Sequence, residues 1–572
     1  MAKDGIAAPL DVGHKVEHVE KGRMRTLGNV RLRHQETNEI ILIPAPSEDP
    51  NDPLNWPQWY KYYMAAVICI AMMMCNFLAA GPSIAIVNMA MDFFPYAQPG
   101  QDSQLFTASV SKVAYFFTTT ALMQGIGNFI WVPVVNKYGR RPTYVISYAI
   151  YFATAVWLSF EHSYGAFLAG RILMGLGAGA AETVAPITIA DIFFLHERGA
   201  VMAFYTSFLA VGVAIGLIIS GLITMNHHWR VIFQVASALI GLVLLIAIFA
   251  FPETAYIRFR PESSTLVRQA SSSPEQPTTT TPDPTSHPDK APEKSTAATI
   301  TTDIESSTPL PIPRKRTYLQ SLKFLPASQL TTEPLPLLLG RPLGLILLPP
   351  IFYSSLVFAS TIGFLVALTS NADVAFQAAY DFRSWQVGLC FAAAIVGSLL
   401  GIPAGGWLGD KIADWGTRRN GGVREPEMRL PAMAVACVAA PVGLGIFGVG
   451  VGRGLHWMVP VLGIGLLNFA IVQGTNVCLV YVIDAYRPVA GEVTLAVMGF
   501  KSLFGFLLSF YTNMWVAEAG YVRAYGTMAA ISAAVLLCWI PLYFWGKKIR
   551  HATWKWRVVS YIHWRDDREV GE

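Results

Sequence analysis

The chain has 572 residues, of which 53% are hydrophobic and only 14% carry a charged side chain. A soluble globular domain has roughly 25% charged residues, so this composition excludes an ordinary water-soluble protein and indicates one embedded in a lipid bilayer. The formal net charge of +5 is small, so the placement of the charges is more informative than their sum.

Apolar stretches that are long enough to cross a membrane recur along the chain, since a helix needs ~20 mostly apolar residues to span the hydrocarbon core. We predict them at 61–84, 106–132, 142–160, 164–189, 200–224, 230–251, 342–368, 385–408, 430–450, 457–482, 494–516 and 522–546. The predicted fold class is therefore an all-α integral membrane protein. Its twelve transmembrane helices form two six-helix bundles, one over 61–251 and the other over 342–546.

Polar segments precede, separate and follow the two predicted bundles. Residues 1–60 form an N-terminal tail, and residues 547–572 form a basic C-terminal tail in which Lys and Arg alternate with Trp. The linker 252–341 is rich in Pro, Ser and Thr, so it cannot bury enough apolar surface to fold and is predicted to be disordered. It serves either as a flexible tether or as a phosphorylation-controlled loop. The basic tail is expected to lie along an anionic membrane surface rather than to bind nucleic acid.

The positions of Lys and Arg predict the orientation in the membrane. If the N-terminus is cytoplasmic, most of the 42 Lys and Arg residues lie on the cytoplasmic side and the short outer loops are nearly free of them. This distribution is typical of membrane proteins, whose cytoplasmic loops are enriched in positive charge. We therefore predict that both termini and the linker are cytoplasmic, and we expect the plasma membrane as the location.

Two loops at equivalent positions of the two halves carry related patterns. They read Asn136-Lys137-Tyr-Gly139-Arg140-Arg141 after the second stretch and Gly406-Trp-Leu-Gly-Asp410-Lys411 after the eighth. Both resemble the signature of the major facilitator superfamily, and the resemblance implies a cytoplasmic gate in which charges and helix ends hold one conformation closed. The first loop has Asn136 where Asp is usual, and the second lacks the Gly-Arg-Arg end. The acidic half of the pattern is thus expected in one repeat and the basic half in the other.

The fourth stretch resembles the helix 4 signature of the same superfamily. Arg171 is followed four residues later by Gly175, and Asp191 and Arg198 lie in the loop that leads to the fifth stretch. The resemblance implies proton coupling through Arg171 and gating through Asp191 and Arg198, and we assign Glu182 of the same stretch to proton coupling as well. For Arg171 the alternative is that it reaches the nearby membrane interface. Glu182 lies deeper, where a carboxylate is costly and is therefore a candidate for function.

Other motifs resemble fungal members of the superfamily in particular. Asp49-Pro50-Asn-Asp52-Pro53 before the first stretch and Tyr481-x-x-Asp484 near the tenth are similar to fungal drug:proton antiporter-like carriers, which include polyamine and histidinol uptake types. The resemblance covers 50–252 and 342–546. Leu217 stands where antiporters usually have Pro, so the antiporter-specific kink is missing.

Polar side chains inside the stretches are the candidates for a substrate cavity, because they lack water partners at that depth. They are Asn76, Gln124, Gln473, Asn476 and Lys501. For the amides, a hydrogen bond between helices worth about 0.6–2 kcal/mol is an equally good explanation. Lys501 and Glu182 are either mutual partners or separate contacts for substrate and proton.

Several classes of function lack their motifs in this sequence. It has no Gly-x₄-Gly-Lys-Ser/Thr loop, no spaced His ligands inside the stretches and no Gly-x-Ser-x-Gly elbow, so we expect neither ATP drive, nor a metal or cofactor, nor an enzyme. We predict a monomeric secondary active transporter that works by alternating access on a small molecule and protons. Three functions remain: proton-coupled efflux of a drug, toxin or secondary metabolite, proton-coupled uptake of a small cationic nutrient such as a polyamine, and a non-transporting membrane sensor.

Overall fold

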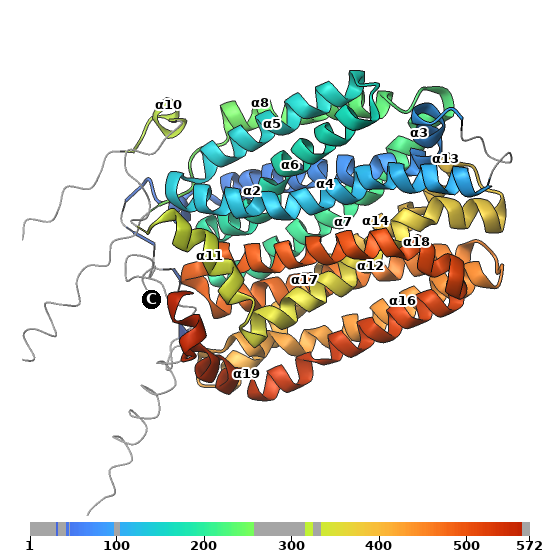
Figure 1. Ribbon diagram of the computed structural model, residues 1–572. Coiled ribbons are helices and arrows are strands. Elements are labelled where there is room, and N and C mark those ends of the chain that lie inside the picture. The colour runs from blue at the N-terminus through green and yellow to red at the C-terminus, as the bar shows by residue number, and fades with distance from the viewer. Residues whose placement is uncertain are drawn as a thin grey trace, which may run out of the picture.

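The computed structural model describes residues 30–31, 42–44, 46–47, 49–96, 103–256, 315–323 and 333–562. This described part is mostly helical, and its long helices lie side by side with roughly parallel axes (Figure 1). Most of the linker that we predict to be disordered lies outside the described residues.

The N-terminal half contains six membrane crossings in the described part of the chain. The elements are α2 (Gln58–Ala80), η2 (Gly81–Ala85), α3 (Ile86–Phe93), α4 (Ser103–Tyr138), α5 (Arg140–Phe160), α6 (Tyr164–Ile192), α7 (Leu195–Asn226) and α8 (Val231–Ala250). The first crossing is interrupted at η2 and continues through α3. Glycines let neighbouring helices approach closely. A Cβ at Gly179 of α6, for example, would lie 2.5 Å from the carbonyl oxygen of Gln124 in α4.

The C-terminal half is built in the same way. Its elements are α12 (Pro349–Tyr380), α13 (Ser384–Cys390), α14 (Ala392–Gly405), α15 (Trp407–Arg419), η3 (Pro426–Ala432), α16 (Met433–Gly452), α17 (Met458–Ala485), α18 (Ala490–Leu537) and α19 (Trp539–Trp554). The long element α18 contains a break at Gly520, whose φ of 76° is accessible mainly to glycine. The break divides α18 between the eleventh and the twelfth crossing.

Eleven helical segments of the described residues are long and apolar enough to cross a membrane. The remaining crossing is α4, which has 36 residues and contains the stretch predicted at 106–132. The structure thus confirms the predicted all-α fold with twelve transmembrane helices in two six-helix bundles.

The seventh crossing differs from the prediction at 342–368. A separate helix, α11 (Leu335–Leu345), precedes it, and α12 begins at Pro349 and Pro350. Proline is tolerated in the first helical turn, where its missing N–H would have no intrahelical partner. At its other end α12 continues to Tyr380, twelve residues beyond the predicted limit.

The C-terminal tail predicted from residue 547 begins within α19 and makes contacts inside the protein. Lys547 donates a 2.5 Å hydrogen bond to Glu425, and Arg550 binds the carboxylate of Glu427 at 2.8 and 2.9 Å. These two cations therefore hold α19 against the segment that leads into α16. The position of this stretch along an anionic membrane surface stays a prediction.

Short segments outside the long helices lie at one end of the helix array. The elements α10 (Tyr318–Ser321), α11 and α19 mark this end (Figure 1). We name it the tail end, and we name the opposite end, which includes the connection between α12 and α13, the far end. At the tail end, β1 (Val30–Arg31) pairs antiparallel with β2 (Val423–Arg424), so that the N-terminal tail contacts the C-terminal half.

The two halves touch each other near both ends. Close to the far end, a Cβ at Gly221 of α7 would lie 3.2 Å from the Cα of Trp385 in α13. At the tail end, a Cβ at Gly199 of the same helix would overlap the carboxylate of Asp410 in α15. Helix α7 therefore follows the C-terminal half over most of its length.

The packing of α14 on α17 predicts a large effect of adding one methyl group. A Cβ at Gly397 would overlap the backbone carbonyl of Gly465, so we expect Gly397→Ala to destabilise the protein by about 1–3 kcal/mol. The measurement is the apparent melting temperature of the detergent-solubilised protein. Gly505→Ala is the matched control, because nothing lies within 4 Å of the added Cβ. Equal melting temperatures of the two variants would contradict the close packing.

Candidate functional site

A pair of opposite charges joins the two halves inside the helix array. Lys501 of α18 donates a charge-assisted hydrogen bond to Oε1 of Glu182 in α6. The Glu182 side chain is fully buried and that of Lys501 is 10% exposed. Each residue lies about 15 Å along its helix from the tail end, at a rise of about 1.5 Å per residue. Of the two alternatives left open by the sequence, the structure shows mutual partners.

The environment of Glu182 leaves part of its carboxylate unsatisfied. Oε2 has no hydrogen-bond partner among the described residues. The backbone carbonyl of Glu182 accepts a 2.7 Å hydrogen bond from Tyr205, which fixes the position of this helical turn. A buried ion pair is stabilising only when its remaining polar atoms are also satisfied. The geometry therefore leaves one carboxylate oxygen able to take a proton or to accept a hydrogen bond from a solute.

Gln124 is a predicted cavity amide that lies next to a close contact between α4 and α18. It is buried, and the next residue, Gly125, is packed so tightly that its Cβ would overlap the side chain of Ser502. Ser502 directly follows Lys501. Gln124 and Lys501 are thus sequence neighbours of the two residues that form this contact, and a substrate role for Gln124 stays a prediction.

The other three amides lie elsewhere. Asn76 donates to the Met72 carbonyl of its own helix at 3.1 Å. Gln473 donates to the Ala432 carbonyl at 2.6 Å, and Asn476 reaches the Gly199 carbonyl of the opposite half at 3.4 Å. These contacts fit the alternative of hydrogen bonds between or within helices. A substrate role for the three residues stays a prediction.

Arg171 is fully buried, so the alternative that it reaches the membrane interface is wrong. Its guanidinium donates to the backbone carbonyls of Phe116 at 3.0 Å, Leu78 at 2.9 Å and Ala79 at 3.2 Å. Leu78 and Ala79 end α2 just before the interruption at η2, where carbonyls lose their intrahelical partners. Arg171 therefore stabilises the break in the first crossing. Its involvement in proton coupling stays a prediction.

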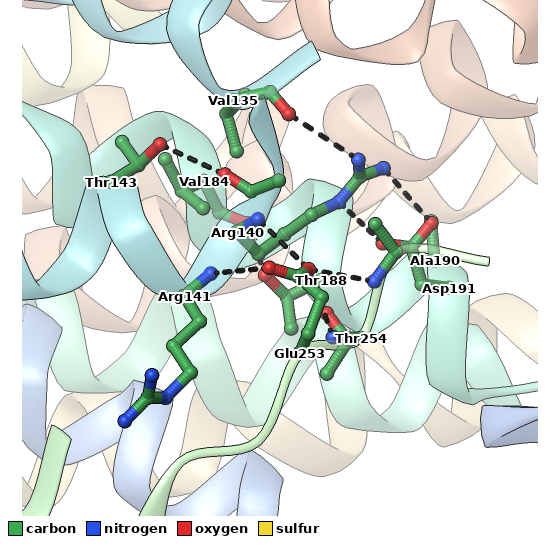
Figure 2. Close-up of polar contacts among 12 residues, drawn as sticks. Val135, Arg140, Arg141, Thr143, Val184, Thr188, Ala190, Asp191, Glu253 and Thr254 are labelled. Carbon is green, nitrogen blue, oxygen red and sulfur yellow. Dashed lines mark hydrogen bonds and ion pairs between the residues drawn. The ribbon is translucent and has the colours of Figure 1, made fainter. Parts of the chain in front are cut away.

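The first gating loop is held by two carboxylates, which Figure 2 shows around Arg140 and Arg141. The Arg140 guanidinium binds both oxygens of Asp191, at 2.7 and 3.2 Å. The backbone N–H groups of Arg140 and Arg141 donate to Glu253 at 2.9 and 3.1 Å. Glu253 thereby caps the N-terminus of α5, where free N–H groups and the helix dipole favour an anion. Sequence reasoning missed Glu253, because it follows the sixth apolar stretch without any recognised motif.

The remaining residues of this loop occupy different environments. Gly139 has a φ of 102°, which permits the sharp turn into α5. The Arg141 side chain donates to the carbonyls of Phe251 and Ile248 and so stays within the N-terminal half. Lys137, in contrast, is partly exposed.

Asn136 lies at the contact between the halves, in the place where the superfamily signature has Asp. Its Oδ1 is 3.4 Å from the position that a Cβ would take at Gly491, near the start of α18. The next residue, Glu492, is buried and bound to Arg341 at 3.2 Å. At this contact the buried carboxylate of α18 belongs to Glu492, whereas residue 136 is a neutral amide.

The second gating loop centres on Asp410, which accepts a 2.5 Å hydrogen bond from Arg429 and lies 3.9 Å from Arg424. These cations come after α15, outside the signature itself. The basic part of the pattern in one loop and the acidic part in the other thus each find an opposite charge within their own half. Burial, together with the neighbouring Arg429, lowers the pKa of Arg424 to about 10.

The tail-end contacts between the halves come from α7. Arg198 lies 3.8 Å from Asp484 of α17. A Cβ at Gly406 would lie 3.1 Å from the Cα of Ala200. Lys411 is turned away and lies over the ring of Trp407, 3.6 Å from its centroid. Thus Arg198 and Asp410 touch the interface between the halves, whereas Lys411 does not contribute a charge pair there.

Comparison with known proteins agrees with this architecture. Residues 64–509 match the family model described as Major Facilitator Superfamily. The chain belongs to this superfamily. Its relatives include the efflux pump radE of Floropilus chiversii, which is 24% identical over 91% of this chain and 86% of the relative. The probable drug/proton antiporter YHK8 of Saccharomyces cerevisiae is 28% identical over 72% of this chain and 73% of the relative.

Solved structures show the same fold for this major facilitator transporter. The proton:xylose symporter XylE matches with a TM-score of 0.56 and 15% identity, over 84% of this chain and 95% of the symporter. The human organic anion transporter MFSD10 matches with a TM-score of 0.55 and 14% identity, over 85% of this chain and the whole of that protein. The superfamily consists of transporters, which are not enzymes.

Because Gly199 lies directly against Asp410, Gly199→Ala is expected to weaken the closed tail end of the transporter. Spin labels at Tyr138 and Arg418, on exposed sites of the two halves, would report longer distances in the variant. Gly165→Ala is the control, since its added Cβ meets nothing within 4 Å. An unchanged distance distribution in the Gly199 variant would show that this contact does not hold the halves together.

Proposed function

We propose that the protein is a proton-coupled exporter of a small molecule, of the drug, toxin or secondary-metabolite class. The observation that carries the proposal is the buried Glu182–Lys501 pair, which lies between the two halves. Relatives named as an efflux pump and as a probable drug/proton antiporter support the direction and the coupling ion.

In the proposed coupling step, a proton binds the Glu182 carboxylate and replaces its ion pair with Lys501. Protonation forms an O–H bond on the carboxylate and removes its charge, so the attraction to Lys501 falls sharply in a medium of low dielectric constant. The halves lose one connection and Lys501 becomes free to contact an acceptor group of the solute. Loss of the proton restores the pair. Proton binding and the relative position of the halves are then linked through one interaction.

The proposed gate lies at the tail end, and the distribution of Lys and Arg supports our proposal that this end faces the cytoplasm. Opening there must separate Arg198 from Asp484 and Gly199 from Asp410, since these contacts cross between the halves. The pair of Arg140 with Asp191 lies within one half and can persist. We propose that ion pairs within one half, such as this one, keep that half rigid while the two halves rock against each other.

Uptake of a small cationic nutrient is the weaker alternative. It gains from an acidic group that attracts a cation, but Lys501 neutralises Glu182 in this structure. A sensor without transport activity would need a folded signalling domain, and the linker 252–341 is too rich in Pro, Ser and Thr to form one. We further propose a monomer in the plasma membrane with both termini in the cytoplasm.

The proposal is tested by comparing metabolites inside and outside cells that carry the wild-type gene, a deletion, or Glu182→Gln. We expect one class of small molecule to accumulate inside the deletion strain and the Glu182→Gln strain alike. Collapse of the pH gradient should cause the same accumulation in wild-type cells. A solute that is instead depleted inside the deletion strain would establish uptake. Identical profiles in all three strains would contradict transport.

A further inference from the structure

A second buried acid, Asp373, lies in α12 and plays no part in the proposed coupling step. Only 4% of the residue is exposed, and neither carboxylate oxygen has a hydrogen-bond partner in the described part of the chain. The polar side chains nearest to it are Gln377, one helical turn further on, and Ser384 at the start of α13. Gln377 and Ser384 are 3.4 Å apart.

Asp373 is far from the Glu182–Lys501 pair. Helix α12 runs beside the first part of α18 in the same direction, and a Cβ at Gly363 would lie 2.8 Å from Phe504. Asp373 follows Gly363 by ten residues, and Lys501 precedes Phe504 by three. At a rise of about 1.5 Å per residue, Asp373 lies about 20 Å closer to the far end than Lys501. The two acids therefore occupy different levels of the membrane.

The charged groups on the neighbouring elements do not compensate Asp373. Arg383 precedes α13 and Arg453 follows α16, and both are exposed. Glu518 and Arg523, near the break in α18, are exposed as well. A carboxylate buried without a counter-charge is costly by several kcal/mol, so a positive species is needed to neutralise it.

A proton is the positive species that fits. A metal ion would need several ligands, and the searched part of the chain contains no group of three or more His, Cys, Asp or Glu residues that could hold one. A proton needs one carboxylate oxygen and no cavity. We propose that Asp373 is a second proton-binding site, loaded from the solution at the far end and separate from the Glu182–Lys501 pair.

Asp373 lies close to the contact between the two halves at the far end. Ser384 lies next to the Asp373 carboxyl group, and its carbonyl oxygen is 3.3 Å from the Cβ position of Gly221 in the opposite half. When the halves separate here, water reaches Ser384 and the acid behind it. Loading then forms one O–H bond on Asp373 and consumes one proton from the far-end solution. This inference rests on the proposed proton coupling and adds a group that senses the pH of one side.

Infrared difference spectroscopy on the full-length protein tests the proposal without a known solute. The protein is reconstituted in one orientation into sealed vesicles, and the proton is the probe. In the wild type we expect a C=O band of a protonated carboxylic acid, sensitive to D₂O, that disappears when only the far-end solution is made alkaline. Asp373→Asn should lack this band. Glu182→Gln should retain it, because Glu182 is paired with Lys501.

A band that persists in Asp373→Asn, or that responds only to the tail-end solution, would overturn the proposal. If Asp373→Asn does not fold, Gln377→Leu keeps the test decisive, because removing a polar neighbour should shift the band frequency and an unchanged frequency counts against Asp373. Failure of the proposed export function is distinguishable, since the metabolite comparison would then fail while the band remains.

Discussion

Replacing Lys501 with Met is expected to abolish transport and to destabilise the protein by about 3–5 kcal/mol, because it leaves the buried Glu182 carboxylate without its counter-charge. Glu182→Gln is expected to abolish proton-linked transport with less effect on stability, since the partly exposed Lys501 retains some access to water. Both effects are measurable on purified protein, as the melting temperature and as solute flux driven by an imposed pH gradient.

The double variant Glu182→Gln/Lys501→Met separates stability from function. Removing both charges eliminates the unpaired group, so the melting temperature should return close to the wild-type value. Transport should stay absent, because neither the exchangeable proton nor the cation remains. If the double variant is as unstable as Lys501→Met alone, the two side chains are not partners. If Glu182→Gln still couples flux to the pH gradient, proton coupling lies elsewhere.

Arg171→Lys is expected to cause a large loss of stability and transport, although the charge is conserved. The planar guanidinium reaches carbonyls on two helices, whereas a single ammonium group cannot match the three directions at once. Each buried carbonyl that loses its donor costs about 1–3 kcal/mol, so we expect a lower melting temperature and strongly reduced transport.

Lys112→Ala is the matched control for this experiment. Lys112 is also a cation in a membrane crossing, but it is exposed and lies over the ring of Phe94, 5.3 Å from its centroid. Its removal should leave stability and transport close to the wild type. Comparable losses in Lys112→Ala and Arg171→Lys would show that the experiment reports a general sensitivity of the helices to lost charge.

The architecture was predictable from the sequence because length and apolar content decide whether a helix crosses a bilayer. The pairing of Glu182 with Lys501 was left open, since 319 residues separate them and only packing of the halves decides which helices meet. Asp373 escaped notice for a simpler reason. The predicted seventh stretch ended at 368, but α12 continues to Tyr380, so the acid was assigned to a loop.

The charge partners at the tail end show a different limit of prediction from sequence. The motif identified Arg140 and Asp410, but their partners include residues that no spacing rule connects to them. Arg429 reaches Asp410 from beyond α15, and Glu253 reaches α5 from beyond α8. A sequence pattern locates one member of such a pair, whereas the fold supplies the other. The motif alone therefore does not predict which residue of the same half neutralises each charge.

The contacts of α7 with the opposite half near both ends have a consequence for the leakage of water and protons across the membrane. Gly221 contacts the opposite half at the far end while Gly199 contacts it at the tail end. The halves can therefore be closed at both ends at the same time. A transport cycle that passes through such a doubly sealed arrangement never offers a continuous water path between the two aqueous phases. If the carrier is proton-coupled as proposed, such a cycle would let protons cross only together with solute, and an idle carrier would not dissipate the gradient.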